Sequence, residues 1–167
     1  MKKFLVVATV FLLALTGCKN KSEKIQSKYG DQNKDVVNSL NDTKDEKLYF
    51  ADLMVLDDNT LQTQFGLTVD EVENYVGAVP YILDSRFYVA IKPTSESKDK
   101  VKRMLKSYAA NLEQRLSDLV TDEDEESKAK LEMIKNHMEK EVNGYYVYIS
   151  SSDNEKVLKI IEKKLEK

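Results

Sequence analysis

The chain has 167 residues, of which 26 are basic and 29 acidic, so its formal net charge is −3. If residues 1–17 are removed, 167 minus 17 leaves 150 residues and a net charge of −5, because Lys2 and Lys3 are lost. That length suffices for one domain with its own core and is short for two. A mildly acidic domain argues against nucleic acid as a partner.

Residues 1–17 have the order of an export signal. Lys2 and Lys3 precede an uncharged apolar stretch of 12 residues, Phe4 to Leu15, and small residues follow it. A membrane-spanning helix needs about 20 apolar residues, so this stretch is too short for a permanent span. It fits the apolar region of a cleaved signal peptide, and the alternative is an N-terminal helix buried in a core.

Cys18 is the only cysteine of the chain and follows that stretch directly. The sequence Leu15-Thr16-Gly17-Cys18 resembles the lipobox of bacterial lipoproteins, which implies a diacylglyceryl group on the thiol and cleavage just before it. Each buried CH₂ contributes about 0.8 kcal/mol, so two acyl chains hold a domain on a membrane where one does not. A disulfide has no partner within the chain. We therefore expect a lipid-anchored protein on the extracytoplasmic side of the cell membrane.

Residues 18–47 are predicted to be the lipidated cysteine followed by a flexible tether. From Lys19 to Lys47 the only large apolar residues are Ile25, Tyr29, Val36, Val37 and Leu40. So polar a segment does not bury enough surface to offset its ordering entropy. The alternative is a short helix around Val36 to Leu40. A single globular domain is expected over residues 48–167.

Two helices are predicted at the start of this domain. The first ends at Gly66. The second begins at a capping box formed by Thr68 and Glu71, in which each side chain satisfies a backbone N–H of the other residue. Gly77 and Pro80 follow within ten residues, so the second helix should be short.

A β-hairpin and a long helix are predicted next. The hairpin consists of a strand from Val79 to Leu83, a turn at Asp84-Ser85 and a strand from Arg86 to Lys92. In the second strand, one face carries the side chains of Phe87, Val89 and Ile91. The long helix is indicated by apolar residues at steps of three and four: Val101, Met104, Leu105, Tyr108, Leu112, Leu116 and Leu119.

The remaining elements are a helix, a strand and a last helix. The helix follows the acidic run 121–127, and its apolar residues are Leu131, Ile134, Met138 and Val142. The strand is Gly144 to Ser150, and Ser152 and Glu155 have the capping-box spacing that opens the last helix. The predicted order is α-α-β-β-α-α-β-α. This is a small α+β domain, with amphipathic helices packed on a three-stranded sheet and covering the face of Phe87, Val89 and Ile91.

Several segments together resemble the bacterial lipoproteins grouped as the domain-of-unknown-function 4358 family. They are the lipobox, Phe65-Gly66-Leu67, the "VENYVG" of Val72 to Gly77, the strand from Phe87 to Lys92, the long helix, and "NGYYVYISSSDNEKV" near the C-terminus. The resemblance covers roughly Leu48 to Leu165. The resemblance implies a location at the cell membrane and a fold. It implies no activity and no site residues, because its motifs are structural.

The sequence contains no motif that carries a known chemistry. It has no Gly-x-Ser-x-Gly elbow, phosphate-binding glycine loop, zinc spacing or dinucleotide fingerprint. His137 is the only histidine, so a Ser-His-Asp arrangement would need it, and we expect it on the partly exposed surface of a helix. The run 121–127 lacks the alternating oxygen ligands and the glycine of a calcium loop. We therefore expect that the protein is not an enzyme, has no catalytic residues and binds no metal or cofactor.

Tyrosine is the residue type that points most clearly to a function. The chain has nine tyrosines, and Tyr88, Tyr146 and Tyr148 are predicted to share one face of the sheet. Tyrosine is enriched where proteins bind partners, so these three form the candidate interaction surface. The alternative is that helices cover this side and the rings belong to the core.

The expected role is a non-enzymatic accessory or interaction module of the cell envelope. Its partners would be the membrane, through the anchor on Cys18, and another envelope protein. A binding protein for a small extracytoplasmic ligand is the alternative, and it would need a concave pocket. An enzyme acting on wall material comes third, because no motif supports it.

Overall fold

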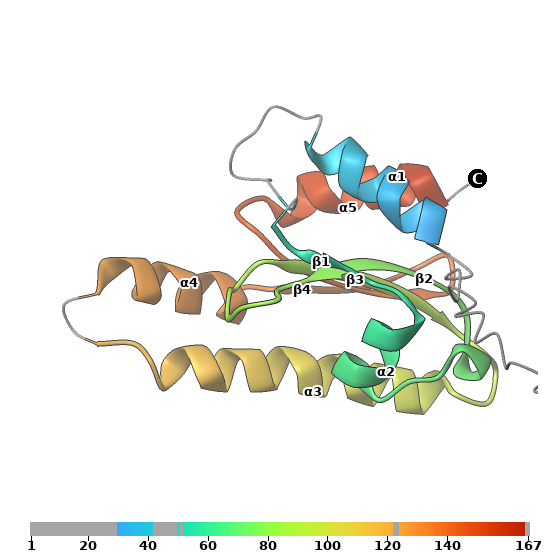
Figure 1. Cartoon of the computed structure of the whole chain (residues 1–167), viewed down its shortest axis with the longest axis horizontal. Coiled ribbons are helices and arrows are strands. Elements are labelled where there is room, and N and C mark those ends of the chain that lie inside the picture. Colours follow the sequence, from blue (N-terminus) through green and yellow to red (C-terminus); the bar gives the residue numbers. More distant parts are fainter. Residues whose placement is uncertain (1–29, 42–49, 51, 122–123, 166–167) are drawn as a thin grey trace, which may run out of the picture.

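The computed structural model describes residues 30–41, 50, 52–121 and 124–165. Within these residues one antiparallel sheet has the strand order β1-β2-β3-β5-β4 (Figure 1). The strands are β1 (Met54–Val55), β2 (Val72–Val79), β3 (Phe87–Pro93), β4 (Met138–Val142) and β5 (Tyr145–Ser150). The predicted α+β class is therefore confirmed, and the predicted three-stranded sheet is wrong, because five strands are present.

Helices cover both faces of the sheet (Figure 1). On one face lie α1 (Gly30–Asn41) and α5 (Asn154–Leu165), and on the other α2 (Asp58–Phe65), α3 (Lys98–Ser117) and α4 (Glu125–Lys135). Each face has its own cluster of buried apolar side chains. None of the described helices is long and apolar enough to cross a membrane.

Strand β2 replaces the second helix predicted from the sequence. The capping box is present, and the Thr68 amide donates to Glu71 Oε2 at 2.9 Å, but it caps only the 3-10 turn Val69–Glu71. Residues 75–79 are all buried, so the alternation that marks a one-sided strand is absent. The helical prediction is therefore wrong because β2 lies inside the sheet, with helices on both faces.

Strand β4 replaces the second half of the predicted helix over the residues that follow the acidic run. The helix α4 ends at Lys135, with Asn136 as its C-cap. Met138 and Val142 are four residues apart, which places them on one face of a helix and equally on one face of a strand. The two-residue turn of Asn143 (φ 51°) and Gly144 (φ 81°) then joins β4 to β5. Positive φ at both positions is the requirement of a type I′ hairpin.

Helix α1 occupies residues that were assigned to the flexible tether. Its apolar residues Val36, Val37 and Leu40 are at most 8% exposed and pack in the cluster on the α5 side of the sheet. The tether prediction is therefore wrong for residues 30–41, where the alternative of a short helix applies. Residues 18–29 and 42–47 lie outside the described part of the chain, as does Cys18.

Asn33 joins α1 to the sheet. Its side chain is 0% exposed. The side-chain Nδ2 donates to Leu56 O at 2.7 Å, and its Oδ1 accepts from the Gly77 amide at 2.7 Å. Gly77 must lack a side chain here, because a Cβ would lie 2.8 Å from Tyr88 O. Asn33 thus supplies polar partners to β2 and to Leu56, the residue that follows β1.

The remaining helices and the strands β3 and β5 agree with the predictions, except that Asp153 and not Ser152 caps α5. The helix before Gly66 is α2, and Gly66 is its left-handed C-cap (φ 63°). The long helix is α3, the two strongest strands are β3 and β5, and the last helix is α5. The cap of α5 comes from Asp153, whose Oδ1 accepts from the Lys156 amide at 3.0 Å. Asp124, in the acidic run, caps α4 by accepting from the Ser127 amide at 3.0 Å.

Candidate functional site

The pairing of β3 with β5 separates the three tyrosines predicted to share a surface. Directly paired residues of an antiparallel sheet have their side chains on the same face, and neighbours along a strand alternate. Tyr88 pairs with Ile149, whereas Tyr148 pairs with Val89. Tyr88 therefore lies on the α1 and α5 side, and Tyr146 and Tyr148 lie on the α3 and α4 side. The predicted common face is wrong.

Two of these tyrosines are core residues. Tyr88 is 0% exposed, its ring meets Phe50 edge-on at a centroid distance of 5.3 Å, and its hydroxyl has no hydrogen-bond partner among the described residues. Tyr148 is 3% exposed and donates from its hydroxyl to Glu139 Oε2 at 3.0 Å. Burial raises the pKa of both phenols. A partner has no access to either ring.

His137 lies in the connection between α4 and β4 and not on a helix surface, so that prediction is wrong. Its Nδ1 is 2.8 Å from Ile134 O and its Nε2 is 3.0 Å from Glu139 Oε1. The imidazole ring also stacks on Tyr148, with the centroids 5.9 Å apart. Within the described residues His137 bonds to no serine hydroxyl, which a Ser-His-Asp arrangement requires. Its contacts fix the beginning of β4.

Tyr146 is half-buried in a shallow groove of about 160 Å³ between α3 and the hairpin of β4 and β5. The Nζ atom of Lys102 lies 6.0 Å from the centroid of the Tyr146 ring, and Glu139 and Glu141 line the same groove. The predicted tyrosine surface is thus reduced to one partly covered ring.

The most exposed large apolar side chains of the described residues lie in the loop that joins β2 to β3. Tyr81 is 80% exposed and Ile82 79%. The strand predicted from Val79 to Leu83 includes both residues, and this prediction is wrong because β2 ends at Val79 and Pro80 follows it. Proline has no N–H to give to a strand ladder, so Pro80 was the available signal that the strand had ended.

Ion pairs at the base of this loop hold it in place. The Arg86 amide donates to Asp84 Oδ1 at 2.8 Å, and Arg86 Nη2 is 2.9 Å from Asp84 Oδ2 and 2.7 Å from Asp52 Oδ2. Burial acts to raise the pKa of Asp84, but the hydrogen bonds from Arg86 outweigh it and lower the pKa. The hydrogen bond to Asp84 also raises the pKa of Arg86. Charge-assisted pairs with more than one hydrogen bond fix geometry as well as charge.

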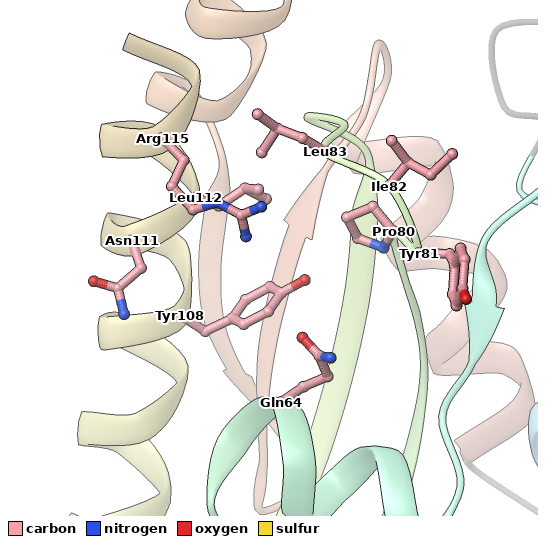
Figure 2. Close-up of a pocket in the computed structure, with 9 residues that line it drawn as sticks. All are labelled: Gln64, Pro80, Tyr81, Ile82, Leu83, Tyr108, Asn111, Leu112 and Arg115. Atoms are coloured by element: carbon pink, nitrogen blue, oxygen red, sulfur yellow. The ribbon is translucent and has the colours of Figure 1, made fainter. Parts of the chain in front are cut away.

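A pocket lies on each side of loop residues 80–83. One, of about 250 Å³, lies between the loop, α2 and α3, and we call it the Arg115 pocket; it is lined by Gln64, Pro80, Tyr81, Ile82, Leu83, Tyr108, Asn111, Leu112 and Arg115. The other, of about 310 Å³, includes Asp52, Leu53 and Asp84. Figure 2 shows Tyr108, Arg115 and Gln64 directed into the Arg115 pocket, while Asn111 points away. The loop therefore forms a ridge between two hollows.

A further exposed apolar side chain, Leu119, follows the end of α3. Leu119 is 60% exposed, although its spacing had placed it on the buried stripe of α3. The helix ends at Ser117, so Leu119 no longer follows the helical repeat. Leu119 comes four residues after Arg115. The C-terminal end of α3 and loop 80–86 lie at the same end of the molecule (Figure 1).

These features define an α+β protein in which the most exposed large apolar side chains of the described residues lie on a loop whose base is held by ion pairs. Comparisons with protein-family models, curated proteins and solved structures found no match. Membership of the domain-of-unknown-function 4358 family therefore stays a prediction. Within the described residues no group of three or more His, Cys, Asp or Glu side chains is placed to hold a metal ion.

Proposed function

We propose that this protein is a lipid-anchored, non-enzymatic interaction module that faces the extracytoplasmic side of the membrane and binds another envelope protein. The observation that carries the proposal is the exposure of Tyr81 (80%) and Ile82 (79%) on a loop whose base is held by Arg86. Exposed apolar side chains on an ordered loop are typical of sites that bind partners. Both faces of the sheet are occupied by helices, so the loop is the better candidate surface.

The position of the loop agrees with an anchor at the N-terminus. The N-terminal end of α1 lies toward one end of the longest axis, whereas loop 80–86 lies toward the other, beside α4 (Figure 1). Cys18 precedes Gly30 by 12 residues. A flexible segment of that length has a root-mean-square reach of roughly 20 Å. We propose that the anchored end of the domain faces the lipid and that the loop faces a partner beyond it.

A protein partner is favoured over a small ligand by the size of the pockets. The Arg115 pocket has about 250 Å³ and its neighbour about 310 Å³. Sites for whole small molecules usually have about 300 to 1,000 Å³ and bury most of the ligand. One pocket is below this range and the other is at its lower limit. Two small hollows beside an exposed ridge instead suit side chains of a protein that covers the ridge.

Residues 80–83, which we call the docking loop, are tested as the binding site by photo-crosslinking in cells that contain the anchored protein. A photoreactive amino acid at position 81 is expected to give a discrete crosslinked product, and Ile82→Ser is expected to remove most of it. Because Ile82 is exposed, the same substitution should change the free energy of unfolding by less than about 0.5 kcal/mol. A photoreactive residue at Lys159, which is exposed on α5, is the control. Equal products from both positions would count against the docking loop.

The anchor is tested by mass spectrometry of the mature N-terminus. We expect a chain that begins at Cys18 and carries a diacylglyceryl group. Cys18→Ser is expected to leave the signal uncut or to move the protein out of the membrane fraction, because the acyl chains provide the binding energy. A mature chain that begins at another residue, without the lipid, would overturn this part of the proposal.

A further inference from the structure

The Arg115 pocket contains hydrogen-bond donors that have no acceptor among the described residues. The Tyr108 hydroxyl and the Arg115 guanidinium form no hydrogen bond or ion pair with any other described residue. Figure 2 shows both groups directed into the pocket, with the Gln64 amide below them. Donors that converge on a hollow without partners are a feature of binding sites.

The Tyr108 hydroxyl is held in one direction. Its ring packs against Phe65 at a centroid distance of 4.6 Å and against Phe87 at 5.4 Å. Burial raises the pKa of Tyr108, although the nearby charge of Arg115 acts in the opposite sense. The hydroxyl is therefore protonated at neutral pH and available to donate.

The charge and the walls of the pocket indicate the chemistry of its occupant. Arg115 is the only charged residue among those that line the pocket. Its planar guanidinium matches the two oxygens of a carboxylate, and one positive charge balances a carboxylate better than a phosphate of charge −1.5 to −2. Pro80, Leu83 and Leu112 also line the pocket, but most of its accessible surface is polar. A volume of about 250 Å³ suits a group the size of a side chain.

We propose that the Arg115 pocket binds a carboxylate group supplied by the partner that docks on loop 80–83. Arg115 and Tyr108 donate to the carboxylate oxygens. The carboxylate comes either from the C-terminus of the partner chain or from one of its acidic side chains. This inference rests on the proposed interaction function and names the chemistry that its site recognises.

The inference is tested by titrating the purified full-length protein with small probes. N-acetyl-leucine presents a terminal carboxylate, N-acetyl-leucinamide is its neutral counterpart, and N-acetyl-leucyl-glutamic acid α-amide presents only a side-chain carboxylate. Binding is measured by calorimetry. At least one carboxylate probe is expected to bind about tenfold or more tightly than the neutral amide, since a hydrogen-bonded charge pair is lost in the amide. The tighter carboxylate probe identifies the source.

Variants locate the binding. Arg115→Met is expected to weaken carboxylate binding about tenfold or more, and Tyr108→Phe several-fold. Arg103→Met removes an exposed charge from the same helix and should leave binding unchanged. Arg115 is exposed and unpaired, so unchanged melting curves are expected for Arg115→Met. Equal binding of the acid and the amide, no binding of either carboxylate, or full binding by Arg115→Met would overturn the inference.

The inference and the proposed function fail in different ways. If the crosslink at position 81 forms but neither carboxylate probe binds, the carboxylate inference is wrong and the docking loop stands. If a carboxylate probe binds through Arg115 but no crosslink forms at position 81, the pocket is confirmed as a carboxylate site and the docking function is wrong.

Discussion

Replacing Asn33 with alanine is expected to lower the free energy of unfolding by about 2 to 5 kcal/mol. The amide of Asn33 is buried and bonds to Leu56 O and to the Gly77 amide, at 2.7 Å in each case. Its removal leaves two buried backbone groups without partners, and each costs about 1 to 3 kcal/mol. Chemical denaturation followed by circular dichroism measures the change.

The control for this substitution is Asn38→Ala on the same helix. Asn38 is exposed, so its loss should change stability by less than about 0.5 kcal/mol, and both variants gain equally in helix propensity. If Asn33→Ala unfolds at the same denaturant concentration as Asn38→Ala, α1 does not contribute to the folded core. The finding that residues 30–41 belong to the domain would then be wrong.

Replacing Tyr148 with alanine is expected to destabilise the protein by about 3 to 5 kcal/mol, the usual range for an aromatic core residue. Tyr148 is 3% exposed, stacks on His137 and donates to Glu139. Tyr148→Phe keeps the ring and removes one hydrogen bond, so it should cost about 1 kcal/mol. Melting curves of the two variants separate the contribution of the ring from that of the hydroxyl.

Tyr146→Ala is the matched control, because Tyr146 lies on the same face of β5 and is only half-buried. It should cost clearly less than Tyr148→Ala. A Tyr148→Ala variant as stable as the wild type would show that the ring is not packed in the core. The original prediction of an accessible tyrosine surface would then become tenable for this residue.

The sequence was sufficient where a single burial pattern extends over a whole element. The helix α3 places one side against the sheet, so its apolar residues recur at steps of three and four over five turns. The strand β5 and the last helix α5 are similarly marked by dense apolar residues after turn or cap residues. The α+β class followed from these elements alone.

The sequence was insufficient where an element depends on its neighbours. The strand β2 is buried on both faces, which removes the alternation that identifies a strand, and the capping box before it is equally compatible with a helix. The edge strand β4 has exposed residues at its centre and apolar ones at its ends, a spacing that a helix shares. Its only clear signal was the turn at Asn143-Gly144.

The candidate site shows the same limit. The register in which β3 pairs with β5 places Tyr88 and Tyr148 against opposite helical layers. That register cannot be predicted from the local sequence pattern of either strand. The hollows beside loop 80–83 are formed by α2, α3 and the residues near β1, which are distant along the chain.

The sequence by itself determined the class of the fold, the strongly patterned elements and the expectation of an N-terminal lipid anchor, because these depend on local order and spacing. Only the tertiary structure decided that residues 30–41 join the core, that both sheet faces are covered and that Tyr81 and Ile82 remain exposed. The physical reason is that burial depends on what packs against a residue. The three apolar residues of α1 gain their stability from β2 and α5, which the sequence of α1 does not contain.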